Sequence, residues 1–373
     1  MKRKKVLFLI HDLGHGGAER VLVNLVNNMD NTKFDITLQS IFDVGIHKKR
    51  ISENVNYTYN FKHMIKGNSR IMKLFSPKIL YKLLIHEKYD IVISYLEGTP
   101  ARIISGCPSN TKKVCWLHVQ LDSSKEVAQS FRSLNEAKKC YESFDQLIAV
   151  AETVKESFYK STGIKKECIK VLYNTNDTDE IIRQSKEQID DLLFKKKEIN
   201  ICSVGRIIEM KGYWRLAKVH KKLIDQGIKH NIYILGVGNQ ENKIRKYISD
   251  NHLNDTFIFL GFKDNPYKYV KNCDLFICSS FREGFSTAVT ESLIVGTPVV
   301  STLCSGAQEL LGYNNEYGLV VENSEEGIYE GLYYLLTHDK ELARYKELAQ
   351  KRGKNFSKER TVKSVETMLE ELI

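Results

Sequence analysis

The stretch Phe281–Leu303, FREGFSTAVTESLIVGTPVVSTL, predicts a loop, a helix and a strand in close succession. Its first residues are polar and include a glycine, which indicates a loop. Ser286 or Thr287 suits the N-cap of the helix, because a side-chain hydroxyl there can accept a free backbone N–H group. Two carboxylates, Glu283 and Glu291, flank this helix start with seven residues between them. We therefore expect one glutamate in the loop and the other inside the helix.

The start of this helix is suited to binding an anion. A helix N-terminus presents free N–H groups at the positive end of the helix dipole, and Gly284 lets a ligand approach the backbone closely. Glu283 would lie at the rim of such a site, and Glu291 would accept hydrogen bonds from hydroxyl groups. A phosphate with a sugar on each side would satisfy all three features. The alternative is a capped surface helix with two solvated glutamates, which the spacing alone does not exclude.

The second half of the chain repeats an alternation of strand and helix. Gly296 and Pro298 suit the end of the predicted helix. Short apolar runs alternate with helical segments on both sides of it, as in a doubly wound parallel sheet. The LGVG segment lacks the third glycine of a dinucleotide-binding fingerprint. The expected strands lie in INICSVGR, HNIYILGVG, TFIFLGF, DLFICSS, TPVVST and GLVVE.

The first half follows the same alternation. The continuous apolar run VLFLI at 6–10 is typical of a buried parallel strand, and it is too short for the core of a signal peptide. A glycine-rich loop at His11–Gly17 leads into a helix predicted over Ala18–Met29. Such a loop can bring backbone N–H groups against a phosphate or a sugar hydroxyl, or it can be a plain turn. Further strands are expected in FDITLQSIF and NVNYTYNF, which alternate, and in YDIVISYLE, KKVCWLHV, FDQLIAVAE and CIKVLYN.

Length and composition indicate a globular protein of two domains. A chain of 373 residues is too long for one ordinary core, and 42% hydrophobic with 27% charged residues is ordinary for a globular protein. No uninterrupted apolar run reaches the ~20 residues of a membrane-spanning helix. The eight cysteines are scattered without a C-x-x-C pair. That usage favours the reduced, buried thiols of a cytosolic protein.

The net charge of +10 is concentrated in the first half. Residues 1–180 contain 28 Lys+Arg and 20 Asp+Glu, and 47–88 contains ten basic residues and two acids. In 61–85, cations alternate irregularly with apolar residues, and Pro77 divides the segment into two helical pieces. Two interpretations stay open: a surface that docks on an anionic membrane, or two amphipathic helices whose apolar side belongs to the core. The membrane interpretation uses Lys62, Lys66, Arg70, Lys73, Lys78 and Lys82 for headgroups and Phe61, Met64, Ile71 and Phe75 for insertion.

In this order and spacing, the motifs resemble the family 4 retaining glycosyltransferases of GT-B architecture. The second half carries SVGRIIEMKG with Arg206 and Lys211, then LGVGNQE, FLGF, the stretch around Glu283 and SGAQELL. The first half carries Gly16-Gly17-Ala18-Glu19-Arg20 after the first strand and His118 in WLHVQLD. The resemblance covers nearly the whole chain.

The resemblance implies an α/β fold of GT-B type, with two Rossmann-like doubly wound domains that face each other across a cleft. We expect an acceptor-binding domain over 1–177 and a nucleotide-sugar donor-binding domain over 195–355, with the junction in the polar segment 174–197. The terminal helix, about 356–373, would pack back on the first domain. Asp177-Thr178-Asp179 spells D-x-D, but in this polar linker we interpret it as structural and not as a metal site.

The resemblance also implies which residues act in catalysis. His118 would position the transferred sugar, and Glu283 would hold its hydroxyl groups. No carboxylate stands out as a nucleophile beneath the anomeric carbon, as most retaining glycosidases have. We therefore favour attack by the acceptor hydroxyl on the face that the leaving phosphate departs from.

The donor would be held by cations and by carboxylates of different roles. Arg206 can bind phosphate oxygens through two N–H groups and Lys211 adds a point charge, although both could belong to a solvated basic loop. Glu291 would hold the ribose hydroxyls, and Glu309 is given no definite role. The expected donor-binding residues are Gly16, Gly17, Arg206, Lys211, Phe262, Lys263, Gly284, Phe285, Ser286, Thr287 and Glu291, with the backbone at Phe262 and Lys263 meeting the base.

The implied activity is transfer of a hexosyl unit from a nucleotide-diphosphate sugar, preferably a UDP-sugar, to a glycan or lipid-linked glycan in bacterial cell-surface polysaccharide synthesis. Basic side chains and the helix N-terminus would replace a divalent metal, so neither a metal site nor a cofactor is expected. The expected partners are the donor and the acceptor, without nucleic acid, and an anionic membrane surface under the first of the two interpretations of 61–85. The enzyme is expected in the cytoplasm, and on the inner face of the membrane under that interpretation.

A second class of function is a basic nucleic-acid- or nucleotide-binding protein without transferase activity. The positive charge favours it, but the basic stretch carries no recognised nucleic-acid motif. A catalytically inactive scaffold is disfavoured because Arg206, Lys211, Glu283 and Glu291 are all present.

Overall fold

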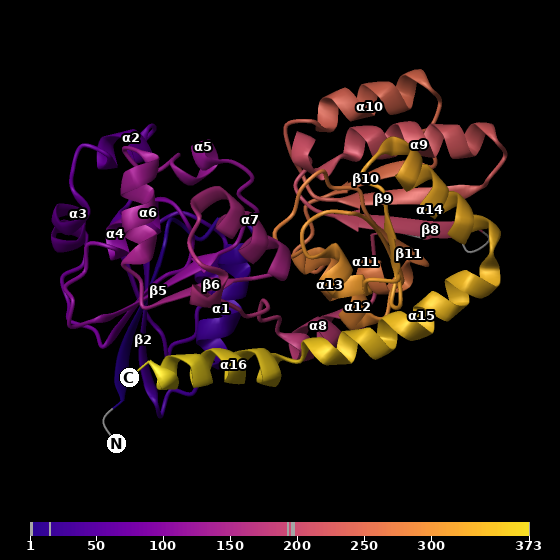
Figure 1. Cartoon of the computed structure of the whole chain (residues 1–373). Helices are drawn as coiled ribbons and strands as arrows, with labels where there is room; N and C mark the ends of the chain where they lie inside the picture. The colour runs from indigo at the N-terminus through magenta and orange to yellow at the C-terminus, as the bar shows by residue number, and fades with distance from the viewer. Residues whose placement is uncertain (1–2, 15, 192–193, 195–197, 373) are drawn as a thin grey trace. The chain divides into compact units, whose positions relative to one another are not determined.

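The chain forms two compact units. The computed structural model describes residues 3–14, 16–191, 194 and 198–372 (Figure 1). Unit 1 comprises Met1–Thr175 with Lys358–Ile373, and unit 2 comprises Asn176–Ser357. The sequence placed the first boundary at residue 177 and the start of the second domain at residue 195, which lies outside the described residues.

Unit 1 contains a seven-stranded sheet in which every pairing between neighbouring strands is parallel. The strand order is β3-β2-β1-β4-β5-β6-β7, so successive strands run outward from β1 in one direction and then from β4 in the other. The crevice where a doubly wound sheet reverses its order is the usual ligand position, at the carboxyl ends of the strands. The strands are β1 (Lys4–Ile10), β2 (Phe34–Phe42), β3 (Asn56–Phe61), β4 (Ile91–Ser94), β5 (Lys112–Leu117), β6 (Gln146–Ala149) and β7 (Ile169–Val171).

Helices cover the sheet of unit 1, and the last helix of the chain is one of them. In α16, Glu366 accepts a hydrogen bond from the backbone N–H of Asp30 at 2.7 Å, and Glu370 pairs with Lys33 at 2.7 Å. α16 also packs on α1. The helices are α1 (Gly17–Asn28), α2 (Asn68–Met72), α3 (Pro77–Leu84), α4 (Thr99–Ile104), α5 (Ser124–Val127), α6 (Leu134–Glu142), α7 (Glu152–Thr162) and α16 (Lys358–Glu371), with 3₁₀ turns η1 (His47–Arg50) and η2 (Lys166–Cys168).

Unit 2 contains a six-stranded parallel sheet with the order β10-β9-β8-β11-β12-β13. Its order reverses between β8 and β11. Apolar side chains of both strands, such as Ile201 and Ile277, are fully buried in the core of this unit. The strands are β8 (Ile199–Val204), β9 (His230–Leu235), β10 (Phe257–Gly261), β11 (Leu275–Cys278), β12 (Val299–Thr302) and β13 (Leu319–Val321).

Two layers of helices enclose the second sheet. α9 packs against α10 and α14, whereas α12 packs against α8, α11 and α15. Figure 1 shows α9 and α10 stacked over the strands of this unit. The helices are α8 (Thr178–Ser185), α9 (Tyr213–Asp225), α10 (Glu241–Asp250), α11 (Tyr267–Asn272), α12 (Thr287–Val295), α13 (Ala307–Leu311), α14 (Glu325–Thr337) and α15 (Asp339–Gly353), with 3₁₀ turns η3 (Glu209–Lys211) and η4 (Lys354–Phe356).

The helix predicted at the centre of the decisive stretch is confirmed. The side chain of Ser286 caps α12 by accepting from the backbone of Val289, and Gly296 ends the helix with a φ of 83°. The Asp177-Thr178-Asp179 segment begins α8, where the Asp177 side chain accepts from the backbone of Glu180. These carboxylates therefore act at a helix start, where the free N–H groups favour negative charge.

The strand expected in FDITLQSIF is confirmed as β2, and it is buried on both faces. β2 is buried along nearly its whole length and lies between β1 and β3. An interior strand of a parallel sheet has no solvent face, so its polar members Thr37, Gln39 and Ser40 are buried too. β3, at the edge of the sheet, is mostly exposed or half-buried.

We expect Gly212→Ala to destabilise unit 2 more than Gly227→Ala. Both glycines have a positive φ, 69° and 82°. Alanine at either position therefore costs about 1–2 kcal/mol of folding free energy, because a residue with a Cβ is strained in the left-handed region. At Gly212 the new Cβ would also lie 2.0 Å from the carbonyl oxygen of Ser279, whereas nothing lies within 4 Å at Gly227. Calorimetry should give the lower Tm for Gly212→Ala, at about 2–4 °C per kcal/mol. Equal Tm values would mean that the Ser279 loop moves aside without cost.

Candidate functional site

The candidate site of unit 2 lies where its sheet reverses order, between β8 and β11. The loop after β8 begins at Gly205 and continues through Arg206 to Lys211, and the loop after β11 runs from Ser279 to Glu283. Both loops leave the carboxyl ends of neighbouring strands, and the crossovers that follow them go to opposite sides. Ligands of doubly wound sheets bind in the crevice that such loops form.

An ion pair joins these two loops. Lys211 Nζ lies 2.6 Å from Glu283 Oε1, and Ser280 Oγ donates to the same oxygen at 2.5 Å. Burial alone would lower the pKa of Lys211, but the Glu283 carboxylate and the neighbouring Cys278 outweigh burial and raise the pKa above its usual value. The lysine is therefore a permanent cation, held in a fixed place at the edge of the sheet.

Arg215 holds the loop that carries Glu283, a role that the sequence did not suggest. Its guanidinium donates to the carbonyl oxygen of Ser279 at 3.0 and 2.7 Å and lies over the ring of Phe281, 3.8 Å from its centroid. Asn323 donates to the carbonyl of Phe281 at 2.8 Å. Arg215 is 2% exposed. Its place on the α9 helix, four residues after Lys211, gave no signal that it would be buried.

The start of α12 lies next along the chain from Glu283. Ser286 is buried at the cap and Thr287 is the first helical residue. The side chain of Phe285 is buried beside Gly306, whose Cβ position would be 2.9 Å from the Phe285 ring. The N-terminal N–H groups of this nine-residue helix give the loop positive potential at the same edge as Lys211.

Glu291 lies inside α12 and is buried, 7% exposed. Its Oε1 is 3.4 Å from the hydroxyl of Tyr267, at the start of α11. Glu309, the other acid considered from the sequence, is buried in the short helix α13. The two glutamates of the stretch therefore occupy different environments: Glu283 is paired with a cation, and Glu291 is paired with a hydroxyl.

The remaining predicted donor residues of unit 2 differ in their surroundings. Arg206 is exposed and forms no ion pair with any residue that the structure describes. Phe262 and Lys263 follow β10, two strands away from β8 and at the edge of the sheet. Phe262 is 47% exposed, and Lys263 Nζ pairs with Asp191 Oδ2 at 2.5 Å.

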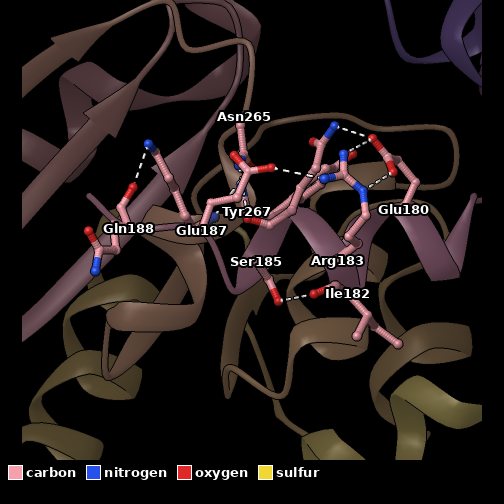
Figure 2. Close-up of polar contacts among 10 residues, drawn as sticks. Glu180, Ile182, Arg183, Ser185, Glu187, Gln188, Asn265 and Tyr267 are labelled. Atoms are coloured by element: carbon pink, nitrogen blue, oxygen red, sulfur yellow. Dashed lines mark hydrogen bonds and ion pairs between the residues drawn. The ribbon is translucent and has the colours of Figure 1, made fainter. Parts of the chain in front are cut away.

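The segment after the unit boundary braces the loop that leads to Tyr267. Figure 2 shows α8 and its following residues beside Asn265 and Tyr267. The side-chain amide of Asn265 donates to the carbonyl of Gln184 and to Glu187 Oε2, both at 2.9 Å. Asn265 Oδ1 in turn accepts from the backbone N–H of Tyr267 at 3.1 Å. These contacts support the residue that meets Glu291.

The other predicted residues, Gly16, Gly17 and His118, belong to unit 1. Gly16 is the N-cap of α1 and Gly17 its first residue. A Cβ at Gly16 would lie 1.9 Å from a carboxylate oxygen of Glu19, so a larger residue would require Glu19 to move. Both glycines are at the carboxyl end of β1, where the sheet of unit 1 reverses its order.

His118 follows β5 at the same edge of this sheet. It is 7% exposed, packs on the ring of Tyr95 with centroids 4.8 Å apart, and its Nε2 has no hydrogen-bond partner among the described residues. Burial lowers the pKa of His118 to about 3. The imidazole is thus neutral near pH 7, and its Nε2 is a buried polar atom for which a ligand hydroxyl would be a partner.

Glu97 is a second residue at this edge that sequence reasoning missed. It follows β4, and its Oε2 accepts from the backbone N–H of His118 at 2.8 Å. Burial raises the pKa of Glu97, although backbone hydrogen bonds oppose that effect. The only available signal was its place just after an apolar strand, in YDIVISYLE.

Comparison with known proteins identifies the class to which these units belong. Residues 184–352 match the family described as glycosyl transferases group 1, and residues 15–180 match the one described as Glycosyltransferase Family 4. The chain therefore belongs to the family 4-like glycosyltransferases, and it is an enzyme with the GT-B fold.

Relatives with full-length matches agree with this assignment. A Campylobacter jejuni protein, named as the N-acetylgalactosamine-N,N'-diacetylbacillosaminyl-diphospho-undecaprenol 4-alpha-N-acetylgalactosaminyltransferase, is 28% identical over 95% of this chain and 96% of its own. The crystal structure of Anabaena HepE in complex with UDP and glucose has a TM-score of 0.79 at 17% identity, covering 99% of this chain and 100% of that one. A Rickettsia africae glycosyltransferase has a TM-score of 0.78 at 18% identity, with 100% and 99% covered.

Two searches over the described residues complete the description. No group of three or more His, Cys, Asp or Glu side chains within them is arranged to hold a metal ion. Within the same ranges, every helix is too short or too polar to cross a bilayer.

Proposed function

We propose that this glycosyltransferase moves a hexosyl unit from a UDP-sugar to a glycan or lipid-linked glycan acceptor in cell-surface polysaccharide synthesis, with retention at the anomeric carbon. The observation that carries the proposal is the Lys211 cation, fixed by Glu283 where the sheet of unit 2 reverses its order. The UDP complex of HepE and the diphospho-undecaprenol acceptor in the Campylobacter name support the donor and acceptor classes.

The donor diphosphate would lie against the positive groups of unit 2. Breaking the anomeric C–O bond leaves additional negative charge on the β-phosphate, and fixed cations and N–H dipoles stabilise such charge most where they need no rearrangement. Lys211 and the N-terminus of α12 supply this potential, and the exposed Arg206 can close on phosphate oxygens through two N–H groups. The base would meet the backbone at Phe262 and Lys263.

Each of the two glutamates would bind a different sugar of the donor. Glu291, buried beside the Tyr267 hydroxyl, would accept hydrogen bonds from the ribose. Glu283 would hold the hydroxyls of the transferred sugar. The contacts of Lys211 and Ser280 both use Glu283 Oε1, so Glu283 can accept from those hydroxyls through Oε2 while Lys211 stays in place.

The transfer step would proceed on one face of the sugar. The bond between the anomeric carbon and the β-phosphate oxygen breaks, and its electron pair stays on the phosphate. The acceptor hydroxyl oxygen bonds to the anomeric carbon from the same face, and its proton passes to the departing phosphate oxygen. His118, neutral because of its burial, would position a sugar hydroxyl through its unpartnered Nε2.

We expect UDP to bind without a divalent metal. In a thermal-shift experiment with excess EDTA, UDP at 100 times its Kd should stabilise the protein by roughly 2.7 kcal/mol. The physical reason is that Lys211, Arg206 and the α12 N-terminus supply the positive charge that a metal would otherwise bring. Stabilisation that disappears with EDTA and returns with Mg²⁺ would contradict metal independence. No stabilisation by any nucleotide or nucleotide sugar would contradict the donor site itself.

We expect Glu291→Ala to impair donor binding and Glu283→Ala to impair turnover. Ribose contacts exist in both the ground and transition states, so Glu291→Ala should weaken UDP-sugar binding on the order of 10–100-fold, as for one hydrogen bond to a charged group. Contacts to the transferred sugar can strengthen at the transition state, so Glu283→Ala should mainly lower kcat. Glu326→Ala, which removes an exposed carboxylate of the same unit, is the control. Wild-type kinetics in both test variants would refute the assignment.

We further propose that unit 1 docks on an anionic membrane through the segment 61–85. Several apolar residues of this segment lie at the surface and not in the core. Leu74, Leu83, Met64 and Ile71 are 76%, 55%, 49% and 48% exposed. Phe61, Phe75, Ile65 and Ile79 are exposed as well, and Lys62, Lys66, Arg70, Lys78 and Lys82 surround them. An exposed apolar patch with basic neighbours is the composition of a membrane-docking surface.

Vesicle flotation tests this docking. Binding should require anionic lipid, fall with salt, and weaken at least about 100-fold when Lys66, Arg70 and Lys73 become Glu, since each cation contributes about 1 kcal/mol. A matched control replaces three exposed lysines of α15, Lys340, Lys346 and Lys351, by Glu. Equal losses in both triple variants, or equal binding to neutral and anionic vesicles, would show that the 61–85 surface is not the docking site.

A further inference from the structure

Unit 1 contains an apolar cavity beneath the exposed segment. Its volume is about 220 Å³, and it opens to the surface among the exposed residues that line it. Asn68 is the single polar residue among the ten that line it. The lining residues are Phe42, Phe61, Ile65, Asn68, Ile71, Met72, Phe75, Leu80, Leu83 and Leu84.

The outer wall of this cavity is held in place by two arginines. Arg102, 1% exposed and paired with Glu136, donates to the carbonyl oxygens of Met72 at 2.8 Å and Phe75 at 2.7 Å. Arg132 donates to the carbonyls of Lys73 at 2.6 Å and Leu74 at 2.8 Å. Four successive carbonyl groups thus accept hydrogen bonds from arginine side chains, which holds this wall in one conformation.

A polar corner adjoins the cavity at the edge of the sheet. Asn68 Oδ1 lies 3.4 Å from His11 Nε2, and His11 Nδ1 lies 2.7 Å from Asp12 Oδ2. The imidazole of His11 packs on Phe42, with centroids 5.1 Å apart. Burial would lower the pKa of His11, but its hydrogen bonds with Asp12 and Asn68 outweigh burial and raise it. The corner is therefore an ion pair of His11 with Asp12, directly after β1 and beside the glycine loop.

The segment that covers the cavity carries only positive charge. Residues 61–85 contain six Lys+Arg and no Asp or Glu. The complement of this arrangement is a molecule with an apolar chain and an anionic head. Five of the lining residues, Phe61, Ile65, Ile71, Phe75 and Leu83, are themselves exposed, so the cavity opens at the surface and an apolar chain can enter it from there.

We propose that the cavity binds the hydrocarbon chain of one isoprenoid phosphate or diphosphate, with the anionic head at the basic side chains of 61–85 such as Lys62, which follows β3 at the carboxyl edge of the sheet. This inference rests on the proposed function, in which the acceptor is lipid-linked, and it assigns the lipid part of that acceptor to a particular place. The chain would enter between α2 and α3, and the head would lead toward the carboxyl edge of β1. That edge also carries Gly16, Gly17 and, after β5, His118.

Farnesyl diphosphate, used below its critical micelle concentration and without vesicles, is the probe. Isothermal titration should show saturable binding of one farnesyl diphosphate molecule per protein molecule. Inorganic diphosphate, which has the head but no chain, should bind at least about 10-fold more weakly, a difference of about 1.4 kcal/mol. Absence of saturable binding, or equal affinity for the two ligands, would overturn the proposal.

Matched pairs of variants test where the hydrocarbon chain lies. Leu83 lines the cavity, whereas Ile79, one turn earlier on the exposed side of α3, does not, and the two are 55% and 48% exposed. Leu83→Glu should weaken farnesyl diphosphate binding at least about 10-fold, while Ile79→Glu should stay within about 2-fold of wild type. Phe75→Glu, at the lining, and Leu74→Glu, outside it, form a second pair with the same expectation. Equal losses within both pairs would place the chain on the general surface and overturn the proposal.

The donor assay separates this inference from the proposed function. Leu83→Glu should retain the full stabilisation by UDP, because the donor residues are in unit 2. If UDP fails to stabilise even the wild-type protein while farnesyl diphosphate binds as expected, the proposed donor function is wrong and the site for the hydrocarbon chain is supported. The opposite result, UDP binding with no difference between Leu83→Glu and Ile79→Glu, overturns the chain site alone.

Discussion

The ion pair between Lys211 and Glu283 is the contact around which unit 2 is arranged. It spans the two loops that leave β8 and β11, at the one place where neighbouring strands of this sheet send their crossovers apart. A partly buried ion pair adds little net stability, because desolvation offsets much of its Coulomb energy. Its value here is positional: it holds a cation and a carboxylate at the edge of the sheet, and Arg215 and Gly212 hold the loops that carry them.

The two units use the same topology to present different chemistry. In unit 2 the carboxyl edge carries cations and a helix N-terminus, which suits a diphosphate. In unit 1 the corresponding edge carries a neutral histidine, because burial keeps the pKa of His118 low, and a carboxylate, Glu97, bound to the backbone of His118. That edge has a hydrogen-bonding group for hydroxyls at His118 and an ion pair of His11 with Asp12.

The exposed apolar residues of 61–85 are unusual because the rest of unit 1 buries its apolar side chains well. Each Å² of apolar surface left in water forgoes about 25 cal/mol. Arg102 and Arg132 bind the carbonyl groups of 72–75 and hold the backbone so that Leu74 and Phe75 stay at the surface. This arrangement distinguishes a maintained apolar surface from a poorly packed loop.

The amino-acid sequence by itself determined the α/β class, the position of α12 between its Ser286 cap and Gly296, and the residues that follow each strand. These features depend on short-range rules of periodicity, capping and turn formation, which act within a few residues. The tertiary structure decided the contact of Lys211 with Glu283, 72 residues away, the burial of Arg215, the support of His118 by Glu97, and the exposure of one side of α3. Periodicity shows that a segment has an apolar face but not what covers it, because strand order and packing bring together residues that local patterns treat separately.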